Sequence, residues 1–139
     1  MSKEFINKKL RQIVQLLSEM EELLDIPYAV YKDKFTNIRT AERNFQLVVE
    51  QASDINVHIS IENGTNTPDT YKDSFRELNK LEILDDKLTK ELTASARLRN
   101  VIVHEYDFDE DNFIFYKSSK KYVVSYKNYI IAIEKYLNN

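Results

Sequence analysis

The sequence is short of the residues that many folds and reactions require. Its 139 residues include no cysteine, one glycine, two prolines and two histidines. Without cysteine there is no disulfide, zinc finger, iron–sulfur cluster or thiol nucleophile. One glycine excludes glycine-rich phosphate loops, and few turn residues argue against sandwiches, barrels and doubly wound sheets. Two histidines are too few for a histidine-rich metal site, so we expect no metal and no other cofactor.

Charge and hydropathy limit the partners and the location. The net charge is −3, so any contact with nucleic acid would be local rather than spread over the surface. The longest apolar run, near residues 129–133, is far shorter than the roughly 20 residues that a membrane span needs. The N-terminal sequence MSKEFINKKLRQ has no signal-peptide apolar core. We therefore expect a cytoplasmic protein without membrane contact.

Apolar residues recur at steps of three and four in three segments, which predicts three amphipathic helices. The second should run from about residue 36 to 62 and end at Asn63-Gly64, where glycine suits a left-handed conformation. The three stripes are Ile6, Leu10, Ile13, Leu17, Met20 and Leu24; Ile38, Ala41, Phe45, Val48, Ala52, Ile55 and Ile59; and Val123, Tyr126, Ile130, Ile133 and Leu137.

The segment between the second and third stripes predicts further helices. Thr67 followed by Pro68 is typical of an N-cap and a first helical position. The next helix should open at Asp85 or Asp86. A turn or two starting at Asp107 or Asp109 should then precede the last helix, over about residues 120–137.

We therefore predict an all-α fold, an up-and-down four-helix bundle with one extra short helix. Because there is no internal repeat and no long linker, residues 1–139 should form a single domain.

Arg99 stands out on the helix predicted to begin at Asp85 or Asp86. At about 100° per residue it falls near the middle of the apolar arc of that helix, where an unpaired guanidinium is costly to bury. It must therefore snorkel to the surface, pair, or face a groove. His104 is five residues further on, which in an ideal helix turns it about 140° away from Arg99. The two can share a site only if the helix ends or distorts near Val103, or if a partner subunit supplies one of them.

The stretch RNVIVHEY, residues 99–106, resembles the RNxxxHxY motif of the HepT-like toxins in the HEPN superfamily. The segment AERNFQLVVEQASDINVHI, residues 41–59, is similar to the second helix of that family. The chain length and the C-terminal helix ending in YL are also similar. The resemblance covers nearly the whole chain, and the motif is complete.

The resemblance implies a metal-independent endoribonuclease, the toxin of a toxin–antitoxin pair whose antitoxin is a small MNT-type nucleotidyltransferase. It also implies a HEPN-like homodimer whose two motifs, each with Arg99 and His104, face each other across a cleft. The motif tyrosine, Tyr106, would be adenylylated by the antitoxin, which silences the nuclease. Alternatively, Tyr106 is a packing residue that seals the helix end.

The chemistry of the motif residues agrees with this function. RNA cleavage without metal uses the 2′-hydroxyl as nucleophile and needs a base, an acid and a cation. His104 can act as base or acid, and the planar fork of Arg99 matches phosphate oxygens. Asn100 would orient His104 or donate to phosphate, or it is an ordinary solvated residue at a helix end. Since one chain supplies one motif histidine, two chains would complete the set.

Other chemistry-bearing residues have structural interpretations. His58 lies near a helix C-terminus and is expected to be structural. Lys117, Lys120 and Lys121 form a small basic cluster that tracks an RNA backbone or, as we prefer, is solvated. Two alternative functions stay open. One is a non-catalytic helical dimer that binds or regulates a nucleotidyltransferase, and the other is an unrelated four-helix adaptor.

Overall fold

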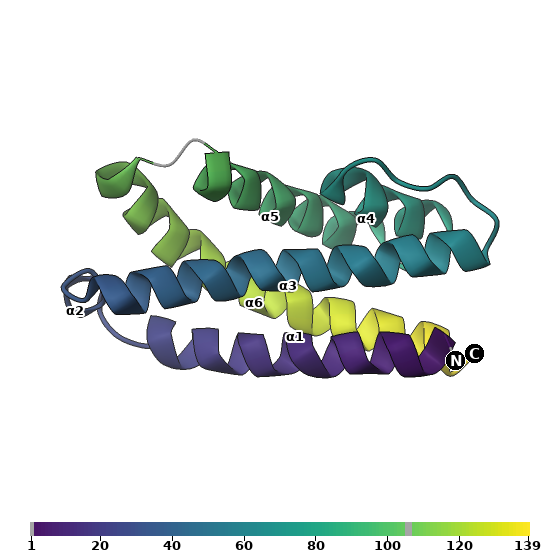
Figure 1. The fold of residues 1–139 in the computed structure, drawn as a ribbon, viewed down its shortest axis with the longest axis horizontal. Coiled ribbons are helices and arrows are strands. Elements are labelled where there is room, and N and C mark those ends of the chain that lie inside the picture. Colours follow the sequence, from purple (N-terminus) through teal and green to yellow (C-terminus); the bar gives the residue numbers. More distant parts are fainter. Residues whose placement is uncertain (1, 105–106) are drawn as a thin grey trace.

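The computed structural model describes residues 2–104 and 107–139, which form helices and no strand. Four helices are long: α1 (Ser2–Leu24), α3 (Phe35–Glu62), α5 (Asp86–His104) and α6 (Phe108–Leu137). Between them lie a single turn, α2 (Tyr28–Tyr31), and a ten-residue helix, α4 (Tyr71–Lys80). Helices α1 and α3 lie side by side, α6 crosses behind them, and α4 and α5 pack along the other edge of α3 (Figure 1). The predicted all-α fold is confirmed, and α2 is an element that the periodicity did not predict.

The first two predicted helices are confirmed. All six residues of the first stripe are buried in α1, and all seven of the second are buried in α3. Helix α3 ends at Glu62, and Gly64 follows with φ +70°, the left-handed conformation expected there. This end is reinforced by Asn63, whose side-chain amide donates to the carbonyl of Ile59 at 2.8 Å.

The predicted start of the short helix is wrong by three residues. Helix α4 begins at Tyr71, and Thr70 rather than Thr67 is its N-cap, with extended backbone angles (φ −131°, ψ 163°). The Thr70 hydroxyl accepts a hydrogen bond from the amide of Asp73 at 3.0 Å. Because both threonines match the local capping pattern, packing decides between them. Starting at Tyr71 places Phe75 and Leu78 in the core.

Helix α5 begins as predicted, and α6 does not. Asp85 caps α5, because its carboxylate accepts from the amide of Leu88 at 2.7 Å. Helix α6 is one continuous helix from Phe108, and not a short turn followed by a second helix near residue 120. The polar segment before residue 113 hid the periodicity. Phe115 and Ser119 are fully buried, so the apolar face continues into the core through the region where a break was expected.

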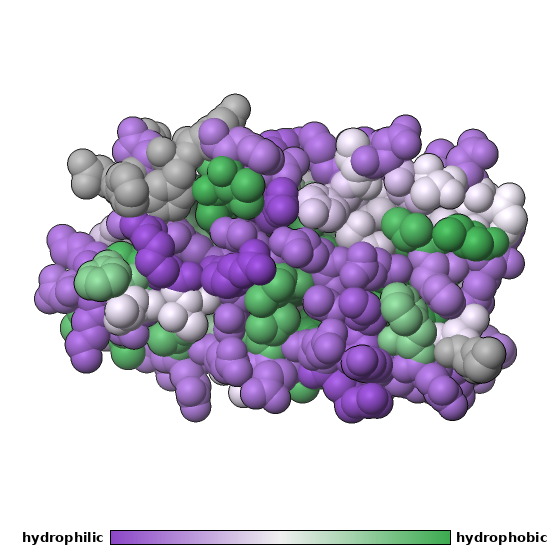
Figure 2. All heavy atoms as spheres, in the orientation of Figure 1, coloured by the Kyte–Doolittle hydropathy of each residue, from purple (hydrophilic) through white to green (hydrophobic). Residues whose placement is uncertain are grey.

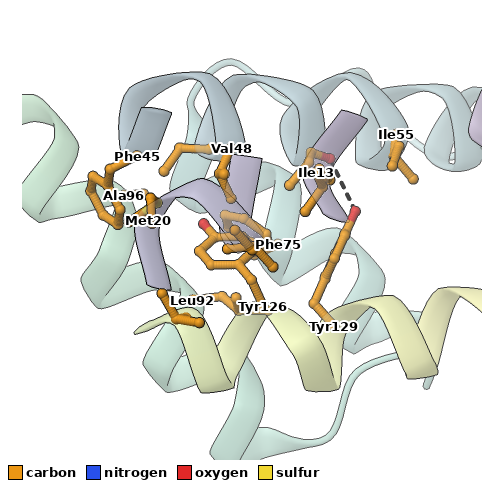
Figure 3. Close-up of a cluster of buried hydrophobic side chains, with 14 of the residues drawn as sticks. Ile13, Met20, Phe45, Val48, Ile55, Phe75, Leu92, Ala96, Tyr126 and Tyr129 are labelled. Atoms are coloured by element: carbon orange, nitrogen blue, oxygen red, sulfur yellow. Dashed lines mark hydrogen bonds between the residues drawn. The ribbon is translucent and has the colours of Figure 1, made fainter. Parts of the chain in front are cut away.

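The core lies where α1, α3, α4, α5 and α6 meet. The rings of Phe75, Tyr126 and Tyr129 pack edge to face around its centre, at centroid separations of 6.0–6.3 Å (Figure 3). The buried Tyr129 hydroxyl donates to Asn56 Oδ1 at 2.7 Å, and the Tyr126 hydroxyl bonds the hydroxyl of Ser95 at 2.7 Å. These bonds tie α6 to α3 and α5, and so fix the position of the helix that carries Arg99.

The face of the molecule in Figure 2 is mostly hydrophilic, with small hydrophobic patches separated from one another. In the part of the chain that the structure describes, none of the helices is both long and apolar enough to cross a membrane.

Candidate active site

Arg99 is held between three helices. Its Nη2 lies 3.5 Å from Oε2 of Glu50 on α3, and its guanidinium carbon lies 4.8 Å from the ring centroid of Tyr71 on α4. The Arg99 side chain is only 15% exposed. Of the three alternatives that the apolar arc left open, pairing is therefore the one observed. A cation held against a carboxylate and an aromatic face has a defined position, which a snorkelling arginine lacks.

Glu50 also faces a second arginine. Arg43, seven residues or about two turns before it on α3, reaches Glu50 Oε2 at 4.0 Å with a side chain that is 61% exposed. No pattern in the sequence singles out Glu50. Its role at Arg99 could not be read from the sequence, because the two residues are 49 positions apart. The only local signal is a carboxylate on the helix that carries the second apolar stripe.

Asn100 lies beside Arg99 and at the wall of a pocket. Its Oδ1 accepts a hydrogen bond from Arg99 Nη1 at 3.3 Å. The pocket has a volume of about 380 Å³ and is lined by Ser53, Pro68, Asp69, Thr70, Tyr71 and Asn100. No hydrogen bond joins Asn100 to His104, although both are among the described residues. Asn100 Oδ1 is therefore directed at Arg99 and not at His104.

His104 is the last residue of α5, and its side chain is exposed. Because α5 is helical from Arg99 through His104, the two side chains leave the helix about 140° apart. The helix does end near Val103, as one of the alternatives above required, but His104 is still helical and this end does not bring the two side chains together. Within a single chain the structure brings Arg99 and Asn100 together and leaves His104 on another face. The remaining motif residue, Tyr106, lies outside the described residues.

His58 has a structural role, as expected, and the predicted lysine cluster lies on α6. The His58 ring stacks on Phe5 at 4.8 Å, and its Nε2 lies 3.0 Å from the Glu62 carboxylate. Lys120 donates to the Tyr116 hydroxyl at 2.8 Å and so belongs to the packing of α6. Lys117 is exposed.

The arrangement can bind an anion. Arg99 Nε is buried without a hydrogen-bond partner among the described residues, and the 15% of the side chain that stays exposed is the part that a ligand can reach. The Glu50 carboxylate holds the guanidinium from one side, and Asn100 holds it from another. Such a fork matches the oxygens of a phosphate, and an imidazole from a second chain could supply the proton transfers.

Comparisons with known proteins agree with the fold and the motif. Over 136 residues the chain is 32% identical to the tRNA nuclease HepT of Aphanizomenon flos-aquae, an alignment that covers 94% of this chain and 92% of that protein. The fold is similar to that of a tri-AMPylated Shewanella oneidensis HEPN toxin in complex with an MNT antitoxin, with a TM-score of 0.82 and 22% identity over 94% of this chain and 97% of that one. The fold is also similar to YutE from Bacillus subtilis, a cytosolic protein of unknown function, with a TM-score of 0.74 and 17% identity over 94% of this chain and 90% of that one.

At these identities the two solved structures show the shared fold. The family itself is shown by sequence, because residues 13–133 match the family described as ribonuclease HepT-like. This match includes the whole of α3 and α5, and with them Glu50, Arg99, Asn100 and His104. The chain therefore belongs to the HepT-like ribonuclease family.

Proposed function

We propose that this protein is an endoribonuclease toxin that cleaves RNA without a metal ion, and that a nucleotidyltransferase antitoxin restrains it. The observation that carries the proposal is the guanidinium of Arg99, mostly buried yet with an unpartnered Nε and held by Glu50, Tyr71 and Asn100. A cation fixed in this way is typical of a phosphate-binding site. The relative named as a tRNA nuclease makes transfer RNA the first substrate to test. The neighbour described as cytosolic supports a cytoplasmic location.

The reaction needs one bond formed and one bond broken at phosphorus. The 2′-oxygen attacks the adjacent phosphorus as a neutral imidazole takes its proton, and the bond to the 5′-oxygen breaks as a protonated imidazole gives that oxygen a proton. The products are a 2′,3′-cyclic phosphate and a 5′-hydroxyl. Arg99 would bind the phosphoryl oxygens, whose negative charge grows in the transition state, and Asn100 would keep the guanidinium in place.

A homodimer would complete this site. One chain carries one motif histidine, and the continuous α5 turns His104 away from Arg99. A two-fold axis between the C-terminal parts of two α5 helices would place the Arg99 of one protomer near the His104 of its partner. The cleft would then hold two imidazoles for the two proton transfers and two guanidinium groups for the phosphate.

The partner would act through Tyr106. The solved toxin with the similar fold is AMPylated and bound to an MNT antitoxin. In this chain, AMP attached to Tyr106 would place a negative phosphate and a bulky nucleotide two residues from His104, which would repel and block an RNA phosphate. The test is the intact mass after incubation with the partner enzyme and ATP. A mass that stays unchanged with an active enzyme would refute the modification.

Cleavage of RNA by matched variants tests the catalytic proposal. We expect Arg99→Ala and His104→Ala each to lower the cleavage rate by about 100-fold or more. Two controls leave the site intact: Arg11→Ala removes an exposed arginine from α1, and His58→Gln removes the other histidine. Both controls should cleave nearly as fast as the wild type, and a metal chelator should change none of the rates.

Two outcomes would contradict this function. If folded Arg99→Ala and His104→Ala proteins cleave as well as the wild type, these residues are not catalytic. If growth arrest persists in variants that no longer cleave RNA, the protein is better described as a helical dimer that binds or regulates a nucleotidyltransferase.

A further inference from the structure

The pocket beside Asn100 is not explained by phosphate binding. It lies where α3, the segment before α4 and the C-terminal half of α5 meet, and it adjoins Arg99 through two of its lining residues. Tyr71 has its ring under the Arg99 guanidinium at 4.8 Å, and Asn100 accepts from Arg99 Nη1. A group that occupied this pocket would therefore sit next to a phosphate bound at Arg99.

The lining of the pocket is polar and rich in hydrogen-bond acceptors. Ser53 contributes a hydroxyl, Asp69 a carboxylate and Asn100 an amide. The carboxylate of Asp69 is acceptor-only when ionised, so it selects a ligand group that donates. Tyr71 adds an aromatic surface, already used by one cation, that suits a flat ring. A nucleobase combines a flat ring with donors at its edge, whereas an apolar ligand would leave these polar groups unpaired.

The segment that carries Asp69 is anchored at both of its ends. The Thr65 amide and hydroxyl both donate to the carbonyl of Ser60, at 3.0 and 2.9 Å. At the other end the Thr70 hydroxyl accepts from the amide of Asp73. Between these anchors, the ring of Pro68 fixes the backbone angle φ of that residue. These bonds fix the two ends of the segment that forms this wall of the pocket.

We propose that this pocket binds the nucleobase on the 5′ side of the scissile phosphate and prefers a base with an exocyclic amino group, cytosine over uracil. The amino group at position 4 of cytosine donates to the Asp69 carboxylate, as acidic side chains do in other nucleic-acid complexes, whereas uracil presents a carbonyl oxygen there. This assignment rests on the proposed nuclease function, because the phosphate at Arg99 fixes which nucleotide enters.

Binding of two mononucleotides tests the pocket without requiring cleavage. Cytidine 3′-monophosphate and uridine 3′-monophosphate are titrated into ¹⁵N-labelled protein, and the amide shifts of Ser53 and Asn100 are followed. We expect the wild type to bind the cytidine nucleotide about tenfold more tightly, the value of one charge-assisted hydrogen bond. The Asp69→Asn variant should bind both with similar affinity, because its amide can donate to uracil as well as accept from cytosine. Asp33→Asn, which changes another exposed aspartate, should keep the wild-type preference.

Mapping of the cut sites separates the two proposals. With a pool of RNAs of mixed sequence, the wild type and Asp33→Asn should cut more often after cytosine than after uracil, and Asp69→Asn should cut with that preference lost. Cleavage by the wild type with no base preference, or with a preference that Asp69→Asn leaves unchanged, would overturn the pocket assignment and leave the nuclease function intact. If the wild type binds the cytidine nucleotide selectively and cuts no RNA, the nuclease function fails and the pocket stands as a nucleotide-binding site. Equal shifts for both nucleotides, or none, would refute the pocket in either case.

Discussion

At the scale of single residues, Glu50 determines whether Arg99 can be buried. The carboxylate lies 3.5 Å from Arg99 and 4.0 Å from Arg43, and the two arginines differ greatly in exposure, at 15% and 61%. The pair with Arg43 is exposed and long, so it contributes little to stability. The pair with Arg99 is largely shielded from water, so the loss of Glu50 would leave a mostly buried cation without its counter-charge.

We predict that Glu50→Gln lowers the free energy of unfolding by about 1 kcal/mol, more than an exposed pair is worth and less than a fully buried one. It should also lower the RNA cleavage rate, because the Arg99 guanidinium loses its anchor. Urea denaturation and initial cleavage rates measure the two effects. The matched control is Arg43→Gln, which removes only the exposed partner and should change stability by less than about 0.5 kcal/mol. Equal effects of the two substitutions would show that Arg99 does not depend on Glu50.

Two buried tyrosines predict how stability falls at alkaline pH. Burial raises the pKa of both Tyr126 and Tyr129 above the ordinary value of about 10. The folded protein therefore keeps both protons at a pH at which the unfolded chain loses them. The stability that these two protonated tyrosines contribute is complete below about pH 9. Above about pH 10 the free energy of unfolding should fall by about 1.4 kcal/mol per pH unit for each tyrosine.

Urea denaturation between about pH 8 and pH 11, with tyrosinate absorbance recorded in parallel, measures this slope. The double variant Tyr126→Phe/Tyr129→Phe should be less stable at neutral pH, since Asn56 and Ser95 lose their hydroxyl partners. Its stability should also depend less on pH in the alkaline range. An identical alkaline slope in the variant and the wild type would show that these two tyrosines do not carry it.

At the scale of secondary-structure elements, the start of α4 offers a direct comparison of two threonines. Thr70 accepts from the amide of Asp73, whereas Thr67 is exposed and lies three residues before this cap. We predict that Thr70→Ala costs about 1 kcal/mol of unfolding free energy, the usual value of an N-cap, and that Thr67→Ala costs a few tenths at most. Urea denaturation of both variants checks this. Equal losses would place the cap elsewhere.

The elements that the sequence predicted well are those in which periodicity alone determines the structure. Helices α1 and α3 have regular stripes, and every residue of those two stripes is buried. The prediction failed where a local pattern was ambiguous. Two threonines three residues apart both resemble caps, and a run of acidic residues before Phe113 obscures the beginning of α6. The start of α4 depends on the packing of Phe75, and the start of α6 on the packing of Phe115. Both are long-range contacts, which a local sequence pattern does not show.

At the scale of the whole molecule, the same distinction separates the predictable part of the site from the rest. Arg99, Asn100 and His104 lie within six positions on one helix, so a short motif identifies them. Glu50 and Tyr71 come from two other helices, and only the packing of α3 and α4 against α5 brings them to Arg99. The pocket beside Asn100 is likewise made of residues from three separate segments. These parts follow from tertiary structure, which the sequence pattern specifies only indirectly.

The assembly itself leads to the last prediction, because α5 separates Arg99 from His104 within one chain. If one cleft holds the His104 imidazoles of both protomers and both are needed, a dimer with a single His104 should cleave poorly. In a random mixture of equal amounts of wild type and His104→Ala, a quarter of the dimers contain two wild-type chains. Cleavage should therefore fall to about a quarter of the rate of the same amount of wild-type protein after subunits are exchanged by unfolding and refolding together. The same proteins mixed without exchange serve as the control and should give about half of that rate, and size-exclusion chromatography checks the dimer. A rate of about half after exchange would show that each chain carries its own complete site. A monomer with full activity would likewise exclude the shared site.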